Sequence, residues 1–443
     1  MAGQVVIVGA GLAGLRAAEH LRAAGWDRAI TVVGAEEHLP YNRPPLSKDL
    51  LVGGTGAGGA AEAHAYAYRR SRSVADVRWR LGTPVVRASL RTRSVTLADG
   101  TVLTYDGLVV ATGLRPSRAA IPGPDFGRYV LRTLDDALRL RERLVPGCSV
   151  VIVGGGFIGC EVAATARTAG CEVTVVEAGA EPMERAIGPE LGRVLRRHHE
   201  DNGVRFVTGR VVSELLSDGP CERVTGAVLD DGTAIPADLI VESVGSRPNV
   251  EWLDGNGLDL HDGVECDNWM RVEGLPGVVA AGDVARFPNP RYDDVPRRVE
   301  HWSVTGDTAR RAAATLAAHL GVRSHDDGPF TPLPSFWSDQ YGVRVQSYGA
   351  PALGDRCVLL DGGLDHPRAL TGGVAMAYYR DRQMVGVVLA GIPESRHRHY
   401  RELVADATVP PRTWTSERPA GGRAYWPGDV GGRPPEVIRP LTV

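Results

Sequence analysis

The sequence has 443 residues, of which 43% are hydrophobic and 23% are charged, and its formal net charge is −3. This length exceeds what one hydrophobic core normally holds, so we expect roughly two to four domains. Charges of both signs are mixed along the chain, which gives no general case for nucleic-acid binding, and no apolar stretch reaches the roughly 20 residues that cross a bilayer. We therefore expect a soluble cytoplasmic protein that binds neither nucleic acid nor membrane.

The chain begins as a nucleotide-binding strand, helix and strand. The apolar run 5–8 leads into a glycine turn, followed by an expected helix over about 12–24 and a strand over 30–33. Glycines in such a turn let a strand pass sharply into a helix and let backbone amides approach a pyrophosphate. The three glycines of this first fingerprint are Gly9, Gly11 and Gly14.

Proline and glycine interrupt the segment that follows. Residues 40–48 read Pro-Tyr-Asn-Arg-Pro-Pro-Leu-Ser-Lys, so we expect no regular structure before the last two of them. Residues 53–60 are mostly Gly, Thr and Ala, and we expect a mobile loop there. Asp99-Gly100 predicts a hairpin. Residues 108–111 then predict a buried strand that ends at Thr112-Gly113.

A second unit repeats this pattern from about residue 150. Strands are expected at 150–153 and 173–176, a hairpin at Asp231-Gly232, and a buried strand within 237–244 that ends at Gly245. Two fingerprints in the same order and spacing predict two related dinucleotide-binding domains, the second inserted into the first. The second fingerprint consists of Gly154, Gly156 and Gly159.

The remaining chain is expected to complete the first domain and to add a third. Residues 278–283 resemble a returning strand, and an Ala-rich helix is expected over about 303–320. After the prolines of 329–334, alternating strands and a helix over about 394–406 predict a small antiparallel sheet with one helix. The tail after Val409 is rich in Pro, Gly and Arg and is expected to be extended surface chain.

A carboxylate usually follows the second strand of a dinucleotide domain, where it accepts hydrogen bonds from ribose hydroxyls. Glu177 has this position in the second unit, and no arginine follows it directly, so we expect a preference for NAD over NADP. In the first unit Glu36 is the expected ribose ligand, with Glu37 as its neighbour.

Cysteine and histidine show no metal-ligand spacing, so no metal site is predicted. A basic solvated face explains His198-His199 and the segment 396–399 better than a metal site does. Among the 50 basic residues Lys48 is the only lysine. The six cysteines, none of which forms a C-x-x-C pair, are Cys148, Cys160, Cys171, Cys221, Cys266 and Cys357.

Two dinucleotides in one chain imply that electrons pass between them, and a flavin is the natural acceptor for a nicotinamide. The chain resembles the FAD-dependent pyridine nucleotide-disulfide oxidoreductases, in the NADH-dependent ferredoxin reductase (putidaredoxin reductase-like) branch of bacterial oxygenase systems. The resemblance covers residues 1 to about 405. It rests on both glycine turns, on 40–48, Ala111-Thr112-Gly113, Ala281-Gly282-Asp283 and Glu300-His301-Trp302, and on Phe336-Trp337-Ser338-Asp339-Gln340-Tyr341-Gly342.

The resemblance implies an α/β fold with two Rossmann-like domains, the NAD domain inserted in the FAD domain, and a C-terminal α+β domain. The expected division is 1–115 with 245–325 for FAD, 116–244 for NAD, and 326–443 for the C-terminal domain with its tail.

The resemblance also implies how FAD is held. Lys48 and Glu161 would form an ion pair beside flavin N5, which tunes the flavin, and hydride transfer then needs no acid-base side chain. For Glu161 the alternative is a surface position on its helix, and for the two tryptophans below it is core packing. The expected FAD residues are Gly9, Gly11, Gly14, Glu36, Arg43, Lys48, Val85, Thr112, Gly113, Arg115, Asp283, Trp302 and Trp337, and the expected NAD residues are Gly154, Gly156, Gly159, Glu177 and Gly245.

Residues 36–52 contain no cysteine, whereas the related disulfide reductases carry a redox-active cysteine pair in this region. A thiol relay is therefore excluded, and we expect electrons to leave the flavin singly for an external carrier. The chain departs from the family at Ala35, Thr308, 53–60 and the tail after Val409.

The leading hypothesis is an NADH-dependent ferredoxin reductase: NADH donates hydride to FAD, and electrons pass to an iron-sulfur protein that serves a P450 or dioxygenase. Four arginines are candidates for docking an acidic ferredoxin, although a solvated helix face explains them as well. One alternative is a reductase or oxidase that acts directly on a small molecule, and another is an NAD(H)-sensing flavoprotein. The candidate arginines are Arg297, Arg298, Arg310 and Arg311.

Overall fold

The computed structural model describes residues 3–53, 59–219, 223–324, 326, 328–364 and 369–409. Its first unit is built on a parallel sheet whose strands run in the order β19-β7-β1-β2-β3. The central strands are almost wholly apolar and buried, as expected for a parallel sheet that is covered on both faces. The strands are β1 (Gln4–Val8), β2 (Ala29–Val33), β3 (Arg78–Arg80), β7 (Gly107–Val110) and β19 (Val278–Ala280).

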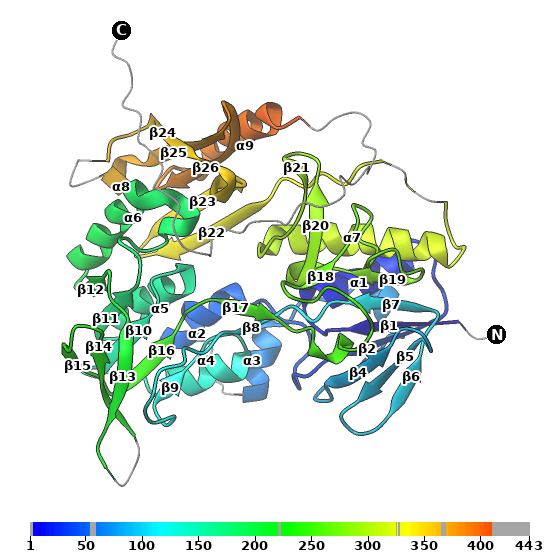
Figure 1. Cartoon of the computed structure of the whole chain (residues 1–443), viewed down its shortest axis with the longest axis horizontal. Coiled ribbons are helices and arrows are strands. Elements are labelled where there is room, and N and C mark those ends of the chain that lie inside the picture. The colour runs from blue at the N-terminus through cyan, green and yellow to red at the C-terminus, as the bar shows by residue number, and fades with distance from the viewer. Residues whose placement is uncertain are drawn as a thin grey trace.

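Two helices lie side by side against this sheet, α1 (Leu12–Ala23) and α7 (Trp302–His319). Both follow the alanine-rich segments that the sequence predicts as helices, and small side chains let the two approach each other closely. Figure 1 shows the unit in blue and cyan on the right, with α7 returning to it from the yellow part of the chain.

The second unit repeats this arrangement with a parallel sheet in the order β12-β11-β10-β16-β9. Helix α5 (Phe157–Thr168) follows the second glycine turn, and α6 (Glu184–Asp201) is kinked at Gly188, whose φ is +76°, beside Pro189. The strands are β9 (Arg128–Tyr129), β10 (Ser149–Val153), β11 (Glu172–Glu177), β12 (Arg205–Thr208) and β16 (Leu239–Glu242).

Each unit carries a small antiparallel sheet at the predicted hairpin. Asp99-Gly100 connects β5 (Ser94–Leu97) to β6 (Val102–Thr104), with β4 (Val85–Ser89) at the edge. Asp231-Gly232 connects β14 (Val224–Leu229) to β15 (Ala234–Pro236), with β13 (Val212–Ser217) at the edge. Both hairpin predictions are confirmed.

The second unit is inserted into the first, because the chain leaves and returns at one place. Strands β8 (Leu114–Pro116) and β17 (Ser246–Pro248) pair antiparallel there. The domain boundaries at residues 115, 244 and 325 stay predictions. Shorter elements around the two units are α2 (Asp49–Val52), α3 (Gly59–Tyr66), α4 (Leu134–Arg141), β18 (Val264–Glu265), β20 (Ala285–Asn289) and β21 (Asp293–Arg298).

The C-terminal part is a five-stranded antiparallel sheet in the order β22-β23-β26-β25-β24 with α9 (Glu394–Ala407) packed on it. Its core continues into α5 and α6 of the second unit. Figure 1 shows the sheet above these two helices. The turn between the last two strands has positive φ at Asp381 and Arg382, as a tight hairpin requires. The elements are β22 (Ser335–Gln340), β23 (Val343–Gly349), β24 (Arg356–Asp361), α8 (Ala369–Gly372), β25 (Val374–Arg380) and β26 (Gln383–Ala390).

Two local expectations need correction. The proline-rich segment is irregular only as far as Arg43, because Pro44–Ser47 forms a 3₁₀ helix in which the ring-fixed φ of proline suits the first helical positions. The expected loop 53–60 lies partly outside the described residues, and α3 already begins at Gly59. The tail from residue 410 also lies outside them. Among the helices of the described ranges, none has the length and apolar character that a membrane span needs.

Candidate dinucleotide sites

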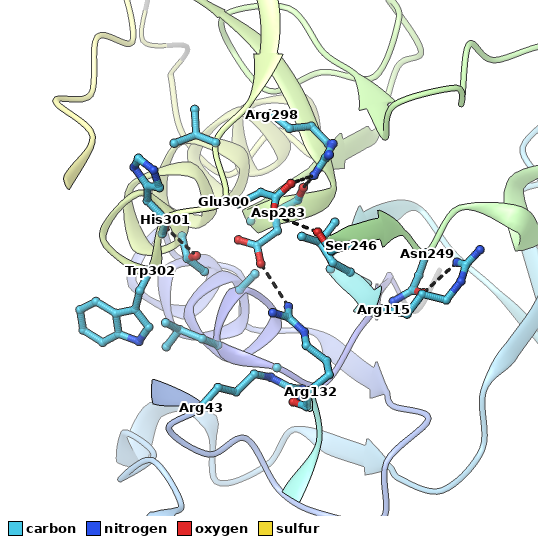
Figure 2. Close-up of a pocket in the computed structure, with 18 of the residues that line it drawn as sticks. Arg43, Arg115, Arg132, Ser246, Asn249, Asp283, Arg298, Glu300, His301 and Trp302 are labelled. Carbon is cyan, nitrogen blue, oxygen red and sulfur yellow. Dashed lines mark hydrogen bonds and ion pairs between the residues drawn. The ribbon is translucent and has the colours of Figure 1, made fainter. Parts of the chain in front are cut away.

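One cavity of about 1680 Å³ extends between the two glycine turns. Its wall includes Gly9–Ala13 of the first turn and Gly156–Ile158 of the second, so both turns open onto the same space. Figure 2 shows this pocket, with charged side chains from several distant segments directed into it. A space of this size exceeds the usual cavity for one small ligand.

The glycines of the first turn have distinct steric roles. A Cβ on Gly9 would lie 2.0 Å from the carbonyl oxygen of Ala111, and one on Gly14 would lie 1.9 Å from the carbonyl oxygen of Gly9. These two glycines therefore let strand and helix pack. A Cβ on Gly11 would meet nothing within 4 Å, because this residue faces the cavity. The first turn thus fits a pyrophosphate at the start of α1.

The second turn has the same geometry. A Cβ on Gly154 would lie 2.4 Å from the carbonyl oxygen of Ser243, and one on Gly159 would lie 2.1 Å from that of Gly154. Gly156 again has open space around it and lines the cavity. Both turns accordingly fit a dinucleotide by the same test.

Glu36 lies on the cavity wall and is held by side chains from the proline-rich segment. Its carboxylate accepts hydrogen bonds from Arg43 Nη2 and from the Tyr41 hydroxyl, each at 2.5 Å. Arg43 also donates to the carbonyl oxygen of Arg132 at 2.6 Å and lies over the Tyr41 ring. Burial raises the pKa of Tyr41, so its hydroxyl stays protonated and keeps donating.

The predicted ion pair between Lys48 and Glu161 is present. Lys48 Nζ lies 2.6 Å from Glu161 Oε2, and the glutamate is 4% exposed, which rules out a surface position. Ser47 donates to the same carboxylate oxygen, and Ser338 Oγ donates to Oε1 at 2.6 Å. The pair joins the first unit to α5 of the second and lines the cavity. A buried carboxylate needs such partners to offset its desolvation.

Charged side chains line the rest of the first unit's side of the cavity (Figure 2). Asp283 Oδ2 lies 3.1 Å from Arg132 Nη2, and Arg115 is held by Asn249 and Glu251. At the same wall Glu300 accepts hydrogen bonds from the Ser246 hydroxyl and from Arg298 Nη1. Three further predicted residues, Val85, Thr112 and Gly113, also line the cavity.

The two predicted tryptophans lie together at the cavity. Their rings make an edge-to-face contact with centroids 5.6 Å apart, and Trp302 Nε1 donates to the Tyr68 hydroxyl at 2.9 Å. Trp302 is 45% exposed, so core packing does not explain it. Trp337 lines the cavity next to it.

Glu177 is the last residue of β11 and is held differently from Glu36. Its carboxylate accepts from the backbone amides of Gly155 at 2.6 Å and Gly179 at 2.7 Å. It does not line the cavity described above, whereas Gly245 does, at a φ of +100° that leaves the backbone open to it.

Two cavity residues were missed by the sequence analysis. His301 is half-buried, its buried Nδ1 has no hydrogen-bond partner within the described chain, and loss of solvent around the ring lowers its pKa to about 4. Arg132 pairs with Asp283. Neither has a sequence signal of its own: His301 sits inside the quoted Glu-His-Trp motif without an assigned role, and Arg132 belongs to no motif.

The docking arginines need one correction. Arg311 is 8% exposed in its side chain and pairs with Asp326, so it is not available at the surface. Arg297, Arg298 and Arg310 are each paired with a carboxylate of this chain.

The cysteines of the described chain are buried and unlinked. Cys160 lies next to Glu161, and burial raises the pKa of its thiol, with the neighbouring carboxylates adding to the effect. It is therefore an inert thiol rather than a redox centre. Cys221 lies outside the described residues.

Comparison with known proteins places these observations in a family. Residues 3–309 match the family model "Pyridine nucleotide-disulphide oxidoreductase", and residues 335–417 match "Reductase C-terminal". The chain is 38% identical to the ferredoxin--NAD(+) reductase component of the p-cumate 2,3-dioxygenase system of Pseudomonas putida, over 80% of this chain and 83% of that one. It is 34% identical to rhodocoxin reductase of Rhodococcus erythropolis, over 90% and 89%.

Solved structures give the same result. The covalent putidaredoxin reductase-putidaredoxin complex matches with a TM-score of 0.79 and 32% identity, covering 92% of this chain and 93% of that chain. The ferredoxin reductase for the CYP199A2 system from Rhodopseudomonas palustris matches with a TM-score of 0.81 and 33% identity, covering 92% and 96%. The chain therefore belongs to the pyridine nucleotide-disulphide oxidoreductase family and carries that family's fold with a reductase C-terminal domain.

Proposed function

We propose that this chain is an NADH-dependent flavoprotein reductase that passes electrons from NADH through FAD to a ferredoxin-type iron-sulfur protein. The observation that carries the proposal is the single cavity onto which both glycine turns open, with a buried Lys48–Glu161 pair in its wall. Two dinucleotides that share one space can bring a nicotinamide and a flavin ring into contact. Since residues 36–52 hold no cysteine, electrons leave without a disulfide step.

The first turn and its surroundings are the proposed FAD site. Gly11 leaves room for the pyrophosphate, Glu36 takes the adenosine ribose, and Arg43 and Arg115 supply positive charge at the cavity wall. Asp283, held by Arg132, accepts from the ribityl hydroxyls. The remaining proposed contacts come from Gly9, Gly14, Val85, Thr112, Gly113, Trp302 and Trp337.

The second turn is the proposed NADH site. Gly156 leaves room for the pyrophosphate, Gly245 keeps the opposite wall open, and Glu177 holds the turn through Gly155 and repels a 2′-phosphate. FAD held by these residues would supply an acceptor for the hydride of NADH and a carrier from which electrons can leave one at a time. Lys48 places a positive charge at the cavity wall, where it favours an electron-rich flavin, and Glu161 keeps that charge in place.

The proposed partner follows from the relatives. These relatives are ferredoxin--NAD(+) reductase components of dioxygenase systems, putidaredoxin reductase and rhodocoxin reductase. We extend this to a ferredoxin that serves a P450 or dioxygenase for this chain. A cytoplasmic location, where NADH is regenerated, belongs to the same proposal and is checked by cell fractionation.

The experiment combines purified protein, NADH, cytochrome c and each of several ferredoxins. Cytochrome c reduction should require the ferredoxin, and flavin absorbance at about 450 nm should bleach with NADH but hardly with NADPH. Absence of ferredoxin-dependent reduction across all ferredoxins would refute the partner. Rapid NADH oxidation by an organic substrate without ferredoxin would instead support a reductase that acts directly on a small molecule.

A further inference from the structure

The buried carboxylate of Glu161 is the end point of a longer hydrogen-bonded series. Ser338 Oγ donates to Glu161 Oε1 at 2.6 Å, Gln340 Nε2 donates to Ser338 Oγ at 2.9 Å, and Gln340 Oε1 lies 2.8 Å from His199 Nε2. All four side chains are buried, with at most 4% of each exposed. The series connects α5, strand β22 of the C-terminal sheet and α6.

The direction of each hydrogen bond is fixed by what its neighbour can accept. Ser338 has one hydroxyl hydrogen, and the carboxylate of Glu161 takes it, so Ser338 Oγ must accept from Gln340. The second amide hydrogen of Gln340 reaches Met183 Sδ at 3.5 Å, which fixes the amide with its oxygen toward His199. His199 must then donate through Nε2.

Donation through Nε2 requires a hydrogen on that nitrogen, which the protonated ring and one neutral tautomer of His199 both carry. Burial lowers its pKa to about 4, so it carries no charge near neutral pH. Its Nδ1 has no hydrogen-bond partner in the described chain, which agrees with an unprotonated nitrogen there. The rings of Phe206 and Tyr341 pack edge-to-face against it and hold its orientation.

We propose that Ser338, Gln340 and His199 are positioning residues that hold the Glu161 carboxylate against Lys48 through one directed series of neutral hydrogen bonds. The proposal rests on the function given above, because it concerns the same pair of residues. Each donor in the series points toward the carboxylate, so the series stabilises its negative charge without adding a second positive charge beside Lys48. The C-terminal sheet thereby fixes a charge at the boundary of the two dinucleotide units.

The chain offers a direct probe, because Lys48 is its only lysine. Lysine labelled with ¹⁵N at Nζ gives one ammonium signal in the FAD-loaded protein, and the exchange of its protons with water reports how firmly Glu161 holds it. Ser338→Ala should speed this exchange about tenfold, as expected for a lost hydrogen bond to a charged group. Gln340→Met and His199→Phe should act in the same direction with smaller effects at each step away from Glu161.

A matched control lies on the neighbouring strand. Ser347 is fully buried on the same face of the sheet, since it stands opposite Phe336 while Val345 stands opposite Ser338. Its Oγ makes no hydrogen bond within the described chain. Ser347→Ala therefore removes the same atom from the same environment without touching the series, and it should change the exchange rate less than about twofold.

A double-mutant cycle separates positioning from packing. In a Glu161→Gln background, Ser338→Ala should change Lys48 exchange less than about twofold, because the residue through which it acts is gone. Equal effects of Ser338→Ala and Ser347→Ala, or a full effect of Ser338→Ala in the Glu161→Gln background, overturn the proposal. If Ser338→Ala does not fold, the isosteric Gln340→Met variant answers the same question against the same control.

The outcome is independent of the electron partner. Proton exchange at Lys48 is measured without NADH or ferredoxin, so a protein that reduces no ferredoxin can still show the expected exchange rates. In that case the proposed function fails and the positioning series stands. Unchanged exchange in a protein that reduces ferredoxin gives the opposite result.

Discussion

The two strand-helix-strand units have the same backbone but hold their carboxylates in different ways. In each unit β1 or β10 pairs in parallel with the next strand over five residues. The glycine turn that ends this first strand contains one glycine with free space around an added Cβ, Gly11 or Gly156. Glu36 lies three residues beyond β2 and is bound by the side chains of Arg43 and Tyr41. Glu177 is the last residue of β11 and is bound by backbone amides of its own unit.

This difference shows that the local pattern determines the turn, whereas distant segments determine how a ligand is held. On the first unit's side of the cavity, the side chains come from the proline-rich segment, from Arg132 and from Asp283, and contacts within the protein already hold them in place. On the second unit's side, Glu177 is held only by backbone amides of neighbouring loops. A site whose charged side chains are already held in place binds its ligand more tightly, because binding costs little side-chain entropy. We therefore expect the first unit to retain its dinucleotide and the second to exchange it.

The strongest way to break the comparison is to fill the open glycine of each unit. Gly11→Val places a side chain where the pyrophosphate lies, so FAD affinity should fall about a thousandfold and the purified protein should be colourless. Gly156→Val should leave the protein yellow but prevent reduction by NADH. Calorimetric titration of the apoprotein with FAD and visible spectra measure both effects.

The control is Gly306→Ala in α7, where an added Cβ meets nothing within 4 Å and no cavity wall is involved. It should keep the flavin. A Gly11→Val protein that retains wild-type FAD affinity would contradict the assignment of FAD to the first glycine turn.

The ion pair that joins the units gives the next effect. Lys48→Met leaves the Glu161 carboxylate buried without its cation and should lower the free energy of unfolding by about 3 kcal/mol. Adding Glu161→Gln should recover part of this loss, because the buried charge is then removed as well. Urea unfolding at constant excess FAD measures both.

An exposed pair provides the reference. Arg398→Met removes a partner of Glu402 on the outer face of α9 and should leave the unfolding transition unchanged. If Lys48→Met also left the free energy of unfolding unchanged, the buried ion pair would not contribute to the stability of the fold.

Sequence alone predicted the parts of this site that are encoded locally. The two glycine turns, both hairpins and the parallel strands follow from short patterns of glycine and apolar residues. Ser338, in contrast, reaches Glu161 across 177 positions of the chain, and only the packed fold brings them together. Strand β22 was not assigned from the sequence because its alternation becomes visible only once its neighbour is known.

One of the four candidate docking arginines was wrong for a related reason. Arg311 belongs to a basic stretch of the sequence, yet its side chain turns inward to Asp326 and Gly328. Which face of a helix is solvated depends on what packs against it, and here α1 and the strand β19 cover α7.

Acid pH tests whether the buried His199 and the half-buried His301 behave alike. Burial lowers the pKa of His199 and of His301 to about 4, below the unfolded value near 6.5. The unfolded chain therefore binds protons first as the pH falls, and each histidine should lower the free energy of unfolding by about 2 kcal/mol at pH 5, with no effect above pH 7. His199→Phe or His301→Phe should flatten this acid limb in urea unfolding.

The exposed His399 supplies the control for removal of a histidine from the surface. If His301 alone kept an ordinary titration by NMR, its ring would face water in the cavity, and the two units would differ in hydration as well as in charge.

The smallest expected effect concerns coenzyme choice and sharpens the comparison of Glu36 with Glu177. Glu177→Gln should raise the KM for NADH about tenfold and narrow the preference for NADH over NADPH, because the charged acceptor that holds the Gly155 amide is lost and the repulsion of a 2′-phosphate is removed. FAD content should stay unchanged, since Glu36 serves the other cleft. Steady-state kinetics with both coenzymes give the ratio of kcat/KM for NADH to that for NADPH. Glu184→Gln is the control for loss of charge alone, because Glu184 accepts a hydrogen bond from the Glu181 amide in the same loop but none from the glycine turn. If Glu184→Gln loses its preference for NADH over NADPH to a similar degree, the preference depends on the total negative charge of this loop and not on the carboxylate of Glu177 that Gly155 holds.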